Sequence, residues 1–407
     1  MPLGYYGLRT ADSEPEVKMG QYRGFGTRSV HAGEAPDPTT GAFGVPIYQN
    51  TTYAFHSYDQ LADWRDGGLP HFYYLRDGNP TTRCLEVKLA DLEGAEAAVA
   101  GASGMAVISA TLLHLVPSGG QLVAAAEMYS VTQEFIRDGL AAHGATAVFV
   151  DFTDLAAVAA AIGPQTRALY TEVLSNPALR LVDLDALAAL ARAHDLPLIV
   201  DNTFLSPAVL RPLEHGATLV IHSATKYLSG HGNVLAGVVC GQRGQIAQIA
   251  RTLSHLGGVL SPFNAWTLLN GVKTLPLRLA QHCANADRLA RFLAAHPAVA
   301  AVSYPGLPGD PGYDLAGRLL GKRRGGMLSF TLHGGQPATR AFLNALELCT
   351  IAVSLGDCAT LIWPFESAAC DPASGAPKLP LLRLSVGIED GDDLEADLAA
   401  ALAHAGR

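Results

Sequence analysis

Short apolar runs alternate with amphipathic helical patterns through the middle of the chain. The runs are rich in β-branched residues and predict strands, and between them lie helical patterns such as Val131–His143 and Leu184–His194. Strands and helices that alternate in this way are typical of an α/β domain, in which helices cover both faces of a mostly parallel sheet. The predicted strands are Gln121–Ala125, Thr146–Asp151, Ala168–Val173, Leu198–Asp201 and Leu219–His222.

The pattern changes on both sides of this region. From Gly24 to Tyr74 the chain is rich in Gly, Pro and Thr and has few helical patterns, which predicts an extended arm that lies on a neighbouring subunit because it cannot build a core alone. After Gly271, a long amphipathic helix over Leu277–His296 precedes mixed strands and helices, which predicts a smaller α+β domain. Its other predicted elements are strands over 325–335 and 381–388 and a helix over Ala338–Leu346.

These patterns divide the 407 residues into three parts. We predict an N-terminal arm over residues 1–75, a large domain over 76–270 and a small C-terminal domain over 271–407. With 49% hydrophobic and 16% charged residues, the chain can bury a large core.

Composition and charge narrow the possible partners. The net charge is −9 and no basic stripe is present, which argues against a nucleic-acid partner. No apolar run is long enough to span a membrane, and the N-terminus lacks a secretory leader, so we expect a cytoplasmic protein. The six cysteines form no CxxC pair and show no zinc-ligand spacing, which indicates free thiols and no metal site.

The segment Ile221–Gly237, IHSATKYLSGHGNVLAG, carries the first candidate chemistry. Ser223, Thr225 and Lys226 follow directly after a predicted strand, and two hydroxyl groups with an amine at that place can bind a phosphate and present a nucleophile. The alternative interpretation is a surface lysine after an ordinary turn.

Asp201 ends the preceding strand in the motif LIVDNTF. A carboxylate at the end of an apolar strand is costly unless a partner offsets its charge. A protonated pyridine nitrogen is such a partner, and a lysine Schiff base together with a carboxylate on the ring nitrogen is what a pyridoxal-phosphate enzyme needs. The alternative is that Asp201 caps the next helix.

Two further motifs are weaker. GASGMAVI, over 101–108, opens a predicted helix with small residues, so the backbone N–H groups of Gly104 and Met105 can approach a phosphate. Tyr129 follows a predicted strand, where its ring can stack on a cofactor. Taken alone, the first is more often a simple turn and the second is as often a core aromatic residue.

Together the motifs resemble the Cys/Met metabolism family of pyridoxal-phosphate enzymes, which includes cystathionine γ-synthase, methionine γ-lyase and O-acetylhomoserine sulfhydrylase. The resemblance runs from about Gly24 to Asp390 and implies fold type I, the aminotransferase-like architecture, in a homotetramer of two catalytic dimers. The motifs that carry it, in addition to those above, are YLRDGNPTT, LSPFNAWTLL, VKTLPLR, AVSLGD and LRLSVGIED.

The resemblance implies roles around the cofactor. Lys226 forms the Schiff base and moves protons, and Asp201 binds the pyridine nitrogen. Tyr129 stacks on the ring and helps to deprotonate the incoming amine. The groups expected to hold the phosphate are those of Ser223, Thr225, Gly104 and Met105, together with Tyr74 and Arg76 from the neighbouring subunit.

It also implies a substrate side. Glu172 and Asn176 lie near the 3-hydroxyl group of the cofactor ring, with Asn176 also near the substrate. Arg383 and the region of Ser354 bind the α-carboxylate, for which the planar guanidinium is well suited. Val353 stands where members that grip cystathionine tend to have Glu, so cystathionine is a poorer candidate substrate.

Other departures bear on the reaction. Val131 replaces a cysteine of methionine γ-lyases, and Leu253–His255 lacks their Lys–Asp pair, which argues against a dedicated methionine lyase. In Leu361–Leu384, Trp363, Pro364 and Phe365 replace the usual His-Pro entrance, and the loop is shortened, which indicates an unusual substrate unless the loop has only drifted.

We therefore expect γ-replacement on an O-activated homoserine such as O-acetylhomoserine, with a small sulfur or carbon nucleophile and a vinylglycine-type intermediate. The alternative is a C–S lyase that eliminates from a sulfur amino acid and releases a 2-oxo acid and ammonia. An inactive cofactor-binding regulator and a transaminase of the same fold are less favoured, because the Lys226, Asp201, Tyr129 and Arg383 set and the family-specific motifs are intact.

Overall fold

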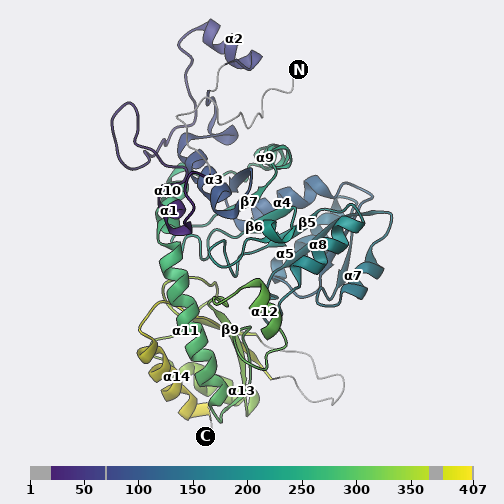
Figure 1. Cartoon of the computed structure of the whole chain (residues 1–407), viewed down its shortest axis with the longest axis vertical. Helices are drawn as coiled ribbons and strands as arrows, with labels where there is room; N and C mark the ends of the chain where they lie inside the picture. The colour runs from purple at the N-terminus through teal and green to yellow at the C-terminus, as the bar shows by residue number, and fades with distance from the viewer. Residues whose placement is uncertain (1–19, 69–70, 366–378, 406–407) are drawn as a thin grey trace.

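The computed structural model describes residues 20–68, 71–365 and 379–405. A seven-stranded sheet with its helices forms the larger part, and the long helix α11 (Leu275–Ala295) runs from it into a smaller part with its own five-stranded sheet (Figure 1). This arrangement confirms the predicted α/β architecture with a smaller α+β C-terminal part. The exact domain limits at residues 75 and 270 stay predictions.

The larger sheet is mostly parallel, as predicted. Only β7 runs antiparallel to its neighbours β1 and β6, and the other pairs are parallel. Five of the strands coincide with the predicted ones to within two residues at either end. In sheet order the strands are β1 (Ala97–Gly101), β7 (Gly237–Gly241), β6 (Leu219–His222), β5 (Leu198–Asp201), β4 (Thr166–Glu172), β2 (Gln121–Ala125) and β3 (Thr146–Val150).

The helices of the larger part follow the predicted alternation. In α8 the cap is Asp183, whose carboxylate accepts the N–H of Ala186, and Leu184, Leu187 and Ala191 are buried along one face. The predicted helix Val131–His143 is a helical run with one π-helical turn in the middle. The helices are α3 (Pro80–Glu93), α4 (Gly104–Leu115), α5 (Ser130–Glu134), η3 (Phe135–Gly139), α6 (Leu140–Ala142), α7 (Leu155–Ala161), α8 (Leu184–Ala193), η4 (Pro212–His215), α9 (Arg243–Leu256) and α10 (Pro262–Lys273).

The N-terminal segment contains helices that the sequence analysis did not predict: α1 (Phe25–His31), α2 (Tyr58–Asp66) and the short η2 (Leu75–Asp77). Helix α1 packs against α3, α10 and α11. A buried ion pair fixes this contact, because Lys88 Nζ lies 3.1 Å from Glu34 and 2.8 Å from the carbonyl oxygen of Ser29. The segment is therefore partly docked on its own subunit through long-range charges.

The smaller part combines an antiparallel sheet with helices. Its strand order is β10-β11-β12-β9-β8, and all pairs are antiparallel except β10 with β11. The elements are β8 (Val299–Ser303), α12 (Tyr313–Leu319), β9 (Met327–Leu332), α13 (Gly335–Asn344), β10 (Thr350–Ile351), β11 (Leu361–Phe365), β12 (Leu381–Ser385) and α14 (Gly391–Ala405).

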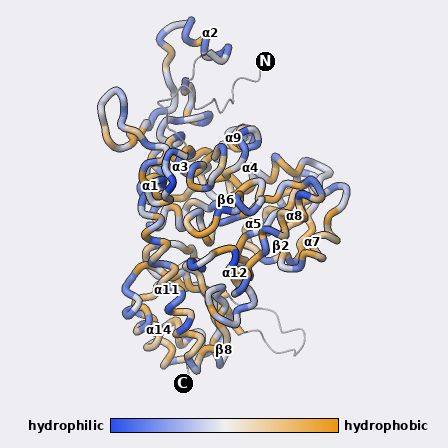
Figure 2. Tube along the Cα trace, viewed as in Figure 1, coloured by the Kyte–Doolittle hydropathy of each residue, from blue (hydrophilic) through white to orange (hydrophobic). Residues whose placement is uncertain are grey.

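Each part has its own hydrophobic core. The larger core surrounds the seven-stranded sheet, and the smaller one lies between the five-stranded sheet and helices α11, α13 and α14. Figure 2 shows hydrophilic and hydrophobic positions alternating along α11 and α14, as expected of helices with one buried face. None of the helices in the described ranges is both long and apolar enough to cross a membrane.

Candidate active site

A cavity of about 680 Å³ lies beyond the carboxyl ends of the parallel strands, where one wall comes from the smaller sheet. This is the edge at which open α/β sheets bind ligands. The structure brings the predicted residues together here, except for Tyr74 and Arg76. Those that line the cavity are Gly104, Met105, Tyr129, Glu172, Asn176, Asp201, Ser223, Thr225, Lys226, Val353, Ser354 and Arg383.

Lys226 follows β6 and points its amine across the cavity toward the smaller part. Its Nζ donates a hydrogen bond to Ser354 Oγ at 2.7 Å. Burial, together with the smaller effect of the positive charge of Arg383, lowers the pKa of Lys226 to about 8. The interpretation of Lys226 as a plain surface lysine is therefore wrong, since the side chain is mostly buried and its amine is close to losing its charge near neutral pH.

Asp201 is a buried carboxylate at the end of β5. It accepts the N–H of Thr203 at 2.9 Å, and the Tyr170 hydroxyl donates to it over 3.5 Å. No helix begins after it, because residues 202–210 form turns, so the helix-cap alternative is wrong. Burial raises the pKa of Asp201, and hydrogen bonds from Thr203 lower it in part. Within the described residues no ion pair offsets this charge, which leaves room for a cationic group of a ligand.

Glu172 lies beside Asp201, because the two residues are register partners on β4 and β5. Its Oε1 accepts the N–H of Tyr129 at 2.7 Å. Burial raises the pKa of Glu172 well above its usual range, and the nearby charge of Asp201 adds to the shift. Two adjacent carboxyl groups in a buried site favour one protonated and one charged group unless a cation binds between or beside them.

The amino end of α4 forms the floor of the cavity. Ser103 caps the helix by accepting the N–H of Ala106 at 3.1 Å, and the first N–H groups, those of Gly104 and Met105, have no partner inside the helix. The backbone there is closely packed, since a Cβ on Gly104 would lie 2.9 Å from the Cβ of Ser223. A helix start against serine and threonine hydroxyl groups is a site that suits a phosphate.

The Thr225 hydroxyl holds the turn after β6 in place. It donates to the carbonyl oxygen of Ala236 at 3.2 Å and accepts the N–H of the same residue at 3.0 Å. A Cβ on the neighbouring Gly237 would lie 2.2 Å from the carbonyl oxygen of Ser103, so only glycine allows this strand to approach the α4 start.

Arg383 enters the cavity from β12. Its Nη1 donates to Asn176 Oδ1 at 2.7 Å, and its Nη2 donates to the carbonyl oxygen of Ser354 at 3.2 Å. The guanidinium also lies over two rings, with its central carbon 5.1 Å from the Phe365 centroid and 5.9 Å from the Phe204 centroid. A guanidinium has five N–H donors, so donors remain for a ligand carboxylate.

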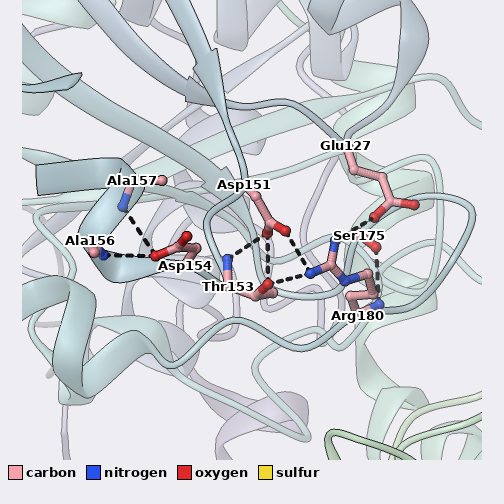
Figure 3. A network of polar contacts seen from close by, with 8 residues as sticks. All are labelled: Glu127, Asp151, Thr153, Asp154, Ala156, Ala157, Ser175 and Arg180. Atoms are coloured by element: carbon pink, nitrogen blue, oxygen red, sulfur yellow. Dashed lines mark hydrogen bonds and ion pairs between the residues drawn. The ribbon is translucent and has the colours of Figure 1, made fainter. Parts of the chain in front are cut away.

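The loop that presents Asn176 is tied to the large sheet by Arg180 (Figure 3). The Arg180 side chain lies 2.7 Å from Asp151 and 3.9 Å from Glu127, and it also contacts Thr153. Two hydrogen bonds of 3.0 Å join Ser175 and Arg180 across the loop: the N–H of Ser175 donates to the carbonyl oxygen of Arg180, and the N–H of Arg180 donates to Ser175 Oγ. Figure 3 shows the Arg180 guanidinium between the two carboxylates, so the Arg180 end of the loop is held by side chains that follow β2 and β3.

Three contributors were missed by the sequence analysis. Thr203 donates its N–H to Asp201, and its hydroxyl accepts the N–H of Ser223 at 2.8 Å, which joins the two key loops. Tyr170 supports Asp201, and Phe204 covers Arg383. Thr203 and Phe204 are the last two residues of the motif LIVDNTF and follow the strand that ends at Asp201. Their place at the carboxyl end of that strand was the signal that could have identified them.

Tyr74 and Arg76 lie elsewhere in this subunit. The Arg76 guanidinium lies 5.2 Å from the centroid of the Tyr74 ring, and neither residue lines the cavity. Their expected role at a neighbouring subunit stays a prediction. Of the altered entrance, Trp363 and Phe365 line the cavity, whereas residues 366–378, on which the expectation of a shortened loop depends, lie outside the described residues.

The donor set fits pyridoxal phosphate. The cavity combines a mostly buried amine, a buried carboxylate without an ion-pair partner in the described ranges, and a helix start beside hydroxyl groups. These match the aldehyde, the pyridine nitrogen and the phosphate of that cofactor, respectively.

Comparisons with known proteins agree with this geometry. The chain is 42% identical over 392 residues to an L-methionine gamma-lyase of Pseudomonas putida, covering 93% of this chain and 97% of the relative. It is 38% identical to a cystathionine gamma-synthase of Mycobacterium leprae, covering 93% and 97%. The crystal structure of cystathionine gamma-lyase from Lactobacillus plantarum, complexed with L-serine, matches with a TM-score of 0.86 at 38% identity, covering 94% and 100%.

A family model matches residues 26–403, which is nearly the whole described chain and includes every residue of the cavity. The description of this family states that its enzymes depend on PLP, the cofactor that the donor set fits. The chain belongs to the Cys/Met metabolism PLP-dependent enzyme family.

Proposed function

We propose that this trans-sulfuration enzyme is a C–S lyase, which eliminates a thiol from an amino acid that carries a neutral sulfur-linked side chain. The observation that carries the proposal is the Lys226 amine, with a pKa of about 8, in a cavity that has Arg383 on one side and apolar residues on the other. The similarity to L-methionine gamma-lyases over 93% of the chain supports elimination better than the γ-replacement that we expected first.

The reaction balances without a second organic substrate. A thioether amino acid with sulfur on its γ-carbon reacts with water to give a thiol, 2-oxobutyrate and ammonium. The carbon–sulfur bond breaks, its electron pair leaves with sulfur, and sulfur then takes up a proton. When bound, pyridoxal phosphate supplies an electron sink that makes the hydrogen on the α-carbon acidic.

The chain's own residues bind the substrate and move its protons. Lys226 Nζ is proposed to take the α-proton and to deliver it further along the side chain, because an amine with a pKa near the working pH can both accept and donate. Arg383 is proposed to bind the α-carboxylate with the donors that Asn176 and Ser354 leave free, and these partners fix its orientation.

Other residues are proposed to hold the cofactor. Asp201 pairs with the pyridine nitrogen, and Tyr129 stacks on the ring and helps to deprotonate the incoming amine. Glu172 and Asn176 lie near the 3-hydroxyl group. The phosphate is bound by Ser223, Thr225, Gly104 and Met105, together with Tyr74 and Arg76 of a neighbouring subunit in a homo-oligomer.

The test is a product assay with the cofactor-loaded enzyme. L-methionine, S-benzyl-L-homocysteine and O-acetyl-L-homoserine are each supplied with and without a thiol, and oxo acid and amino-acid products are followed by mass spectrometry. We expect 2-oxobutyrate and ammonium from a thioether substrate without added thiol. A new amino acid that forms only when thiol is present, with no oxo acid from any thioether, would return the assignment to γ-replacement.

A further inference from the structure

The smaller sheet places an aromatic wall beside the carboxylate-binding arginine. In β11 alternate side chains point to opposite faces, and Ile362 is completely buried in the smaller core. Trp363 and Phe365 therefore share the other face, and both line the active-site cavity. Trp363 is paired directly with Arg383 on β12, and directly paired residues of antiparallel strands project to the same side.

The order of the strands leaves this wall open to the cavity. Strand β10 pairs with Leu361 and Ile362 only, so the following residues of β11 form an edge, where Pro364 is tolerated. The N–H of Ala352 donates to the carbonyl oxygen of Ile362 at 3.2 Å, which continues the contact between the two strands by one residue. Val353 is 62% exposed and lines the same cavity.

The wall offers apolar area but no spare charge. Arg383 donates to Asn176 and Ser354, and its remaining N–H donors are assigned to the substrate carboxylate. The remaining carboxylate on the lining outside the cofactor set, that of Glu127, lies toward Arg180 at 3.9 Å. Partly exposed aromatic surface in a cavity gains most from an apolar partner, and most of all from another ring.

We propose that Trp363 and Phe365 are specificity-determining residues that select substrates with a large apolar group on sulfur, an aromatic one above all. This inference rests on the proposed lyase function and names its substrate class. Phe365 has a second role as a positioning residue, since its ring packs against the Arg383 guanidinium at 5.1 Å.

Binding without turnover tests the wall separately from the lyase assignment. Two amino acids that have carbon in place of sulfur cannot undergo the elimination: L-norleucine replaces methionine, and L-2-amino-6-phenylhexanoate replaces S-benzylhomocysteine. Their dissociation constants for the cofactor-loaded enzyme are measured by titration calorimetry. We expect the phenyl compound to bind at least about 10-fold more tightly, as one buried aromatic contact allows.

Substitutions then show which residue causes the preference for the phenyl compound. Trp363→Ala is expected to reduce the ratio of the two dissociation constants to about 2 or less and to change norleucine binding less than about threefold. Trp363→Phe keeps a ring and is expected to retain most of the preference, which guards against a folding defect in the alanine variant. Phe365→Leu is expected to weaken both ligands, because Arg383 loses its ring partner. Leu256→Ala, an exposed apolar residue away from the cavity, is the matched control.

Each outcome decides one of the two claims. Equal binding of the two ligands by the unaltered enzyme, or an equal loss for both ligands in Trp363→Ala, would overturn the aromatic wall. A preserved preference with no thiol released from any thioether would support the wall and contradict the lyase assignment. A higher kcat/KM for S-benzyl-L-homocysteine than for methionine, reversed in Trp363→Ala, would support both.

Discussion

The two sides of the cavity are built in different ways. On the side of the larger sheet, Asp201 and Glu172 are the last residues of buried parallel strands, and Lys226 lies in the turn after β6. Each of the three makes a hydrogen bond of 2.7 to 2.9 Å. On the side of the smaller sheet, Trp363 and Phe365 lie on the part of β11 that is paired on one side only, with β12, and both are partly exposed and line the cavity.

This difference indicates that the two sides have different tasks: the larger sheet carries the reacting groups, and the smaller sheet determines which substrate binds. Buried charged groups have to be fixed in place, since moving one of them leaves a charge without a partner in a region of low polarity. An apolar wall tolerates change, because replacing one ring by another alters fit but leaves no group unsatisfied. We therefore expect substitutions on the large-sheet side to affect the reaction itself, and substitutions on the small-sheet side to affect which substrate is used.

Of the substitutions around Lys226, Asp201→Asn should lower the activity most. Asp201→Asn removes the charge that we propose to pair with the pyridine nitrogen, and breaking a buried pair costs roughly 3–5 kcal/mol. We expect kcat to fall about 100-fold or more and cofactor affinity to fall as well. Steady-state rates and a cofactor titration followed by visible absorbance measure the two effects. The exposed Asp287→Asn, which loses only a surface pair with Arg291, is the control and should change neither.

Arg383→Lys is expected to act on substrate binding. Lysine keeps the charge but loses the planar fork that bonds Asn176 and Ser354 and that we propose to bind the substrate carboxylate. We expect kcat/KM to fall about 100-fold, mostly through a higher KM, because truncating a buried charged contact costs roughly 2–5 kcal/mol. A fall in kcat with an unchanged KM would place the carboxylate elsewhere. Arg318→Lys, in a surface ion pair with Asp183, should be silent.

Arg180→Met should have a smaller effect, because its ion pairs with Asp151 and Glu127 are partly exposed and such pairs contribute at most about 1 kcal/mol. We expect KM to rise by about fivefold or less, since the Asn176 loop loses one anchor. Restoring the charge with Arg180→Lys should recover part of this. A change in kcat alone, with KM unaltered, would argue that the loop does not act through Asn176 and Arg383.

The pH dependence of cofactor loading should show the lowered pKa of Lys226. Only the neutral amine attacks the aldehyde, and burial lowers its pKa to about 8, so the neutral fraction rises as the pH rises toward 8 and levels off above it. We expect the rate of covalent loading of the cofactor-free protein to rise up to about pH 8 and to reach a plateau by about pH 9. A rate that keeps rising to pH 10, as for an ordinary lysine, would contradict this environment.

The predictable and unpredictable features of the site follow the same division. The strand ends at Asp201 and His222 and the motifs around them could be predicted, because apolar runs mark buried strands and polar residues after them mark the ligand edge. The supporting contacts of Tyr170 and Phe204 could not, since they depend on which strands become neighbours in the sheet.

Elsewhere the local pattern was insufficient. Strands β1 and β7 consist of small and β-branched residues without alternation, so nothing in their sequence distinguishes them from the surrounding turns and helices. The helices of the N-terminal segment are short, and α1 is stabilised by contacts with α3, α10 and α11, including the distant Glu34–Lys88 pair. The π-helical turn of Phe135–Gly139 likewise has no local signature.

The central claim is that one amine, that of Lys226, both binds the cofactor and moves the protons of the elimination. Lys226→Ala tests it most directly, with Lys322→Ala as a matched control on an exposed lysine. Visible absorbance after loading with pyridoxal phosphate and gel filtration, together with 2-oxo acid release, is measured for both variants. We expect Lys226→Ala to lose the covalently bound cofactor and at least about 1000-fold of the activity, while Lys322→Ala retains both. Retention of bound cofactor and turnover by Lys226→Ala would contradict the account.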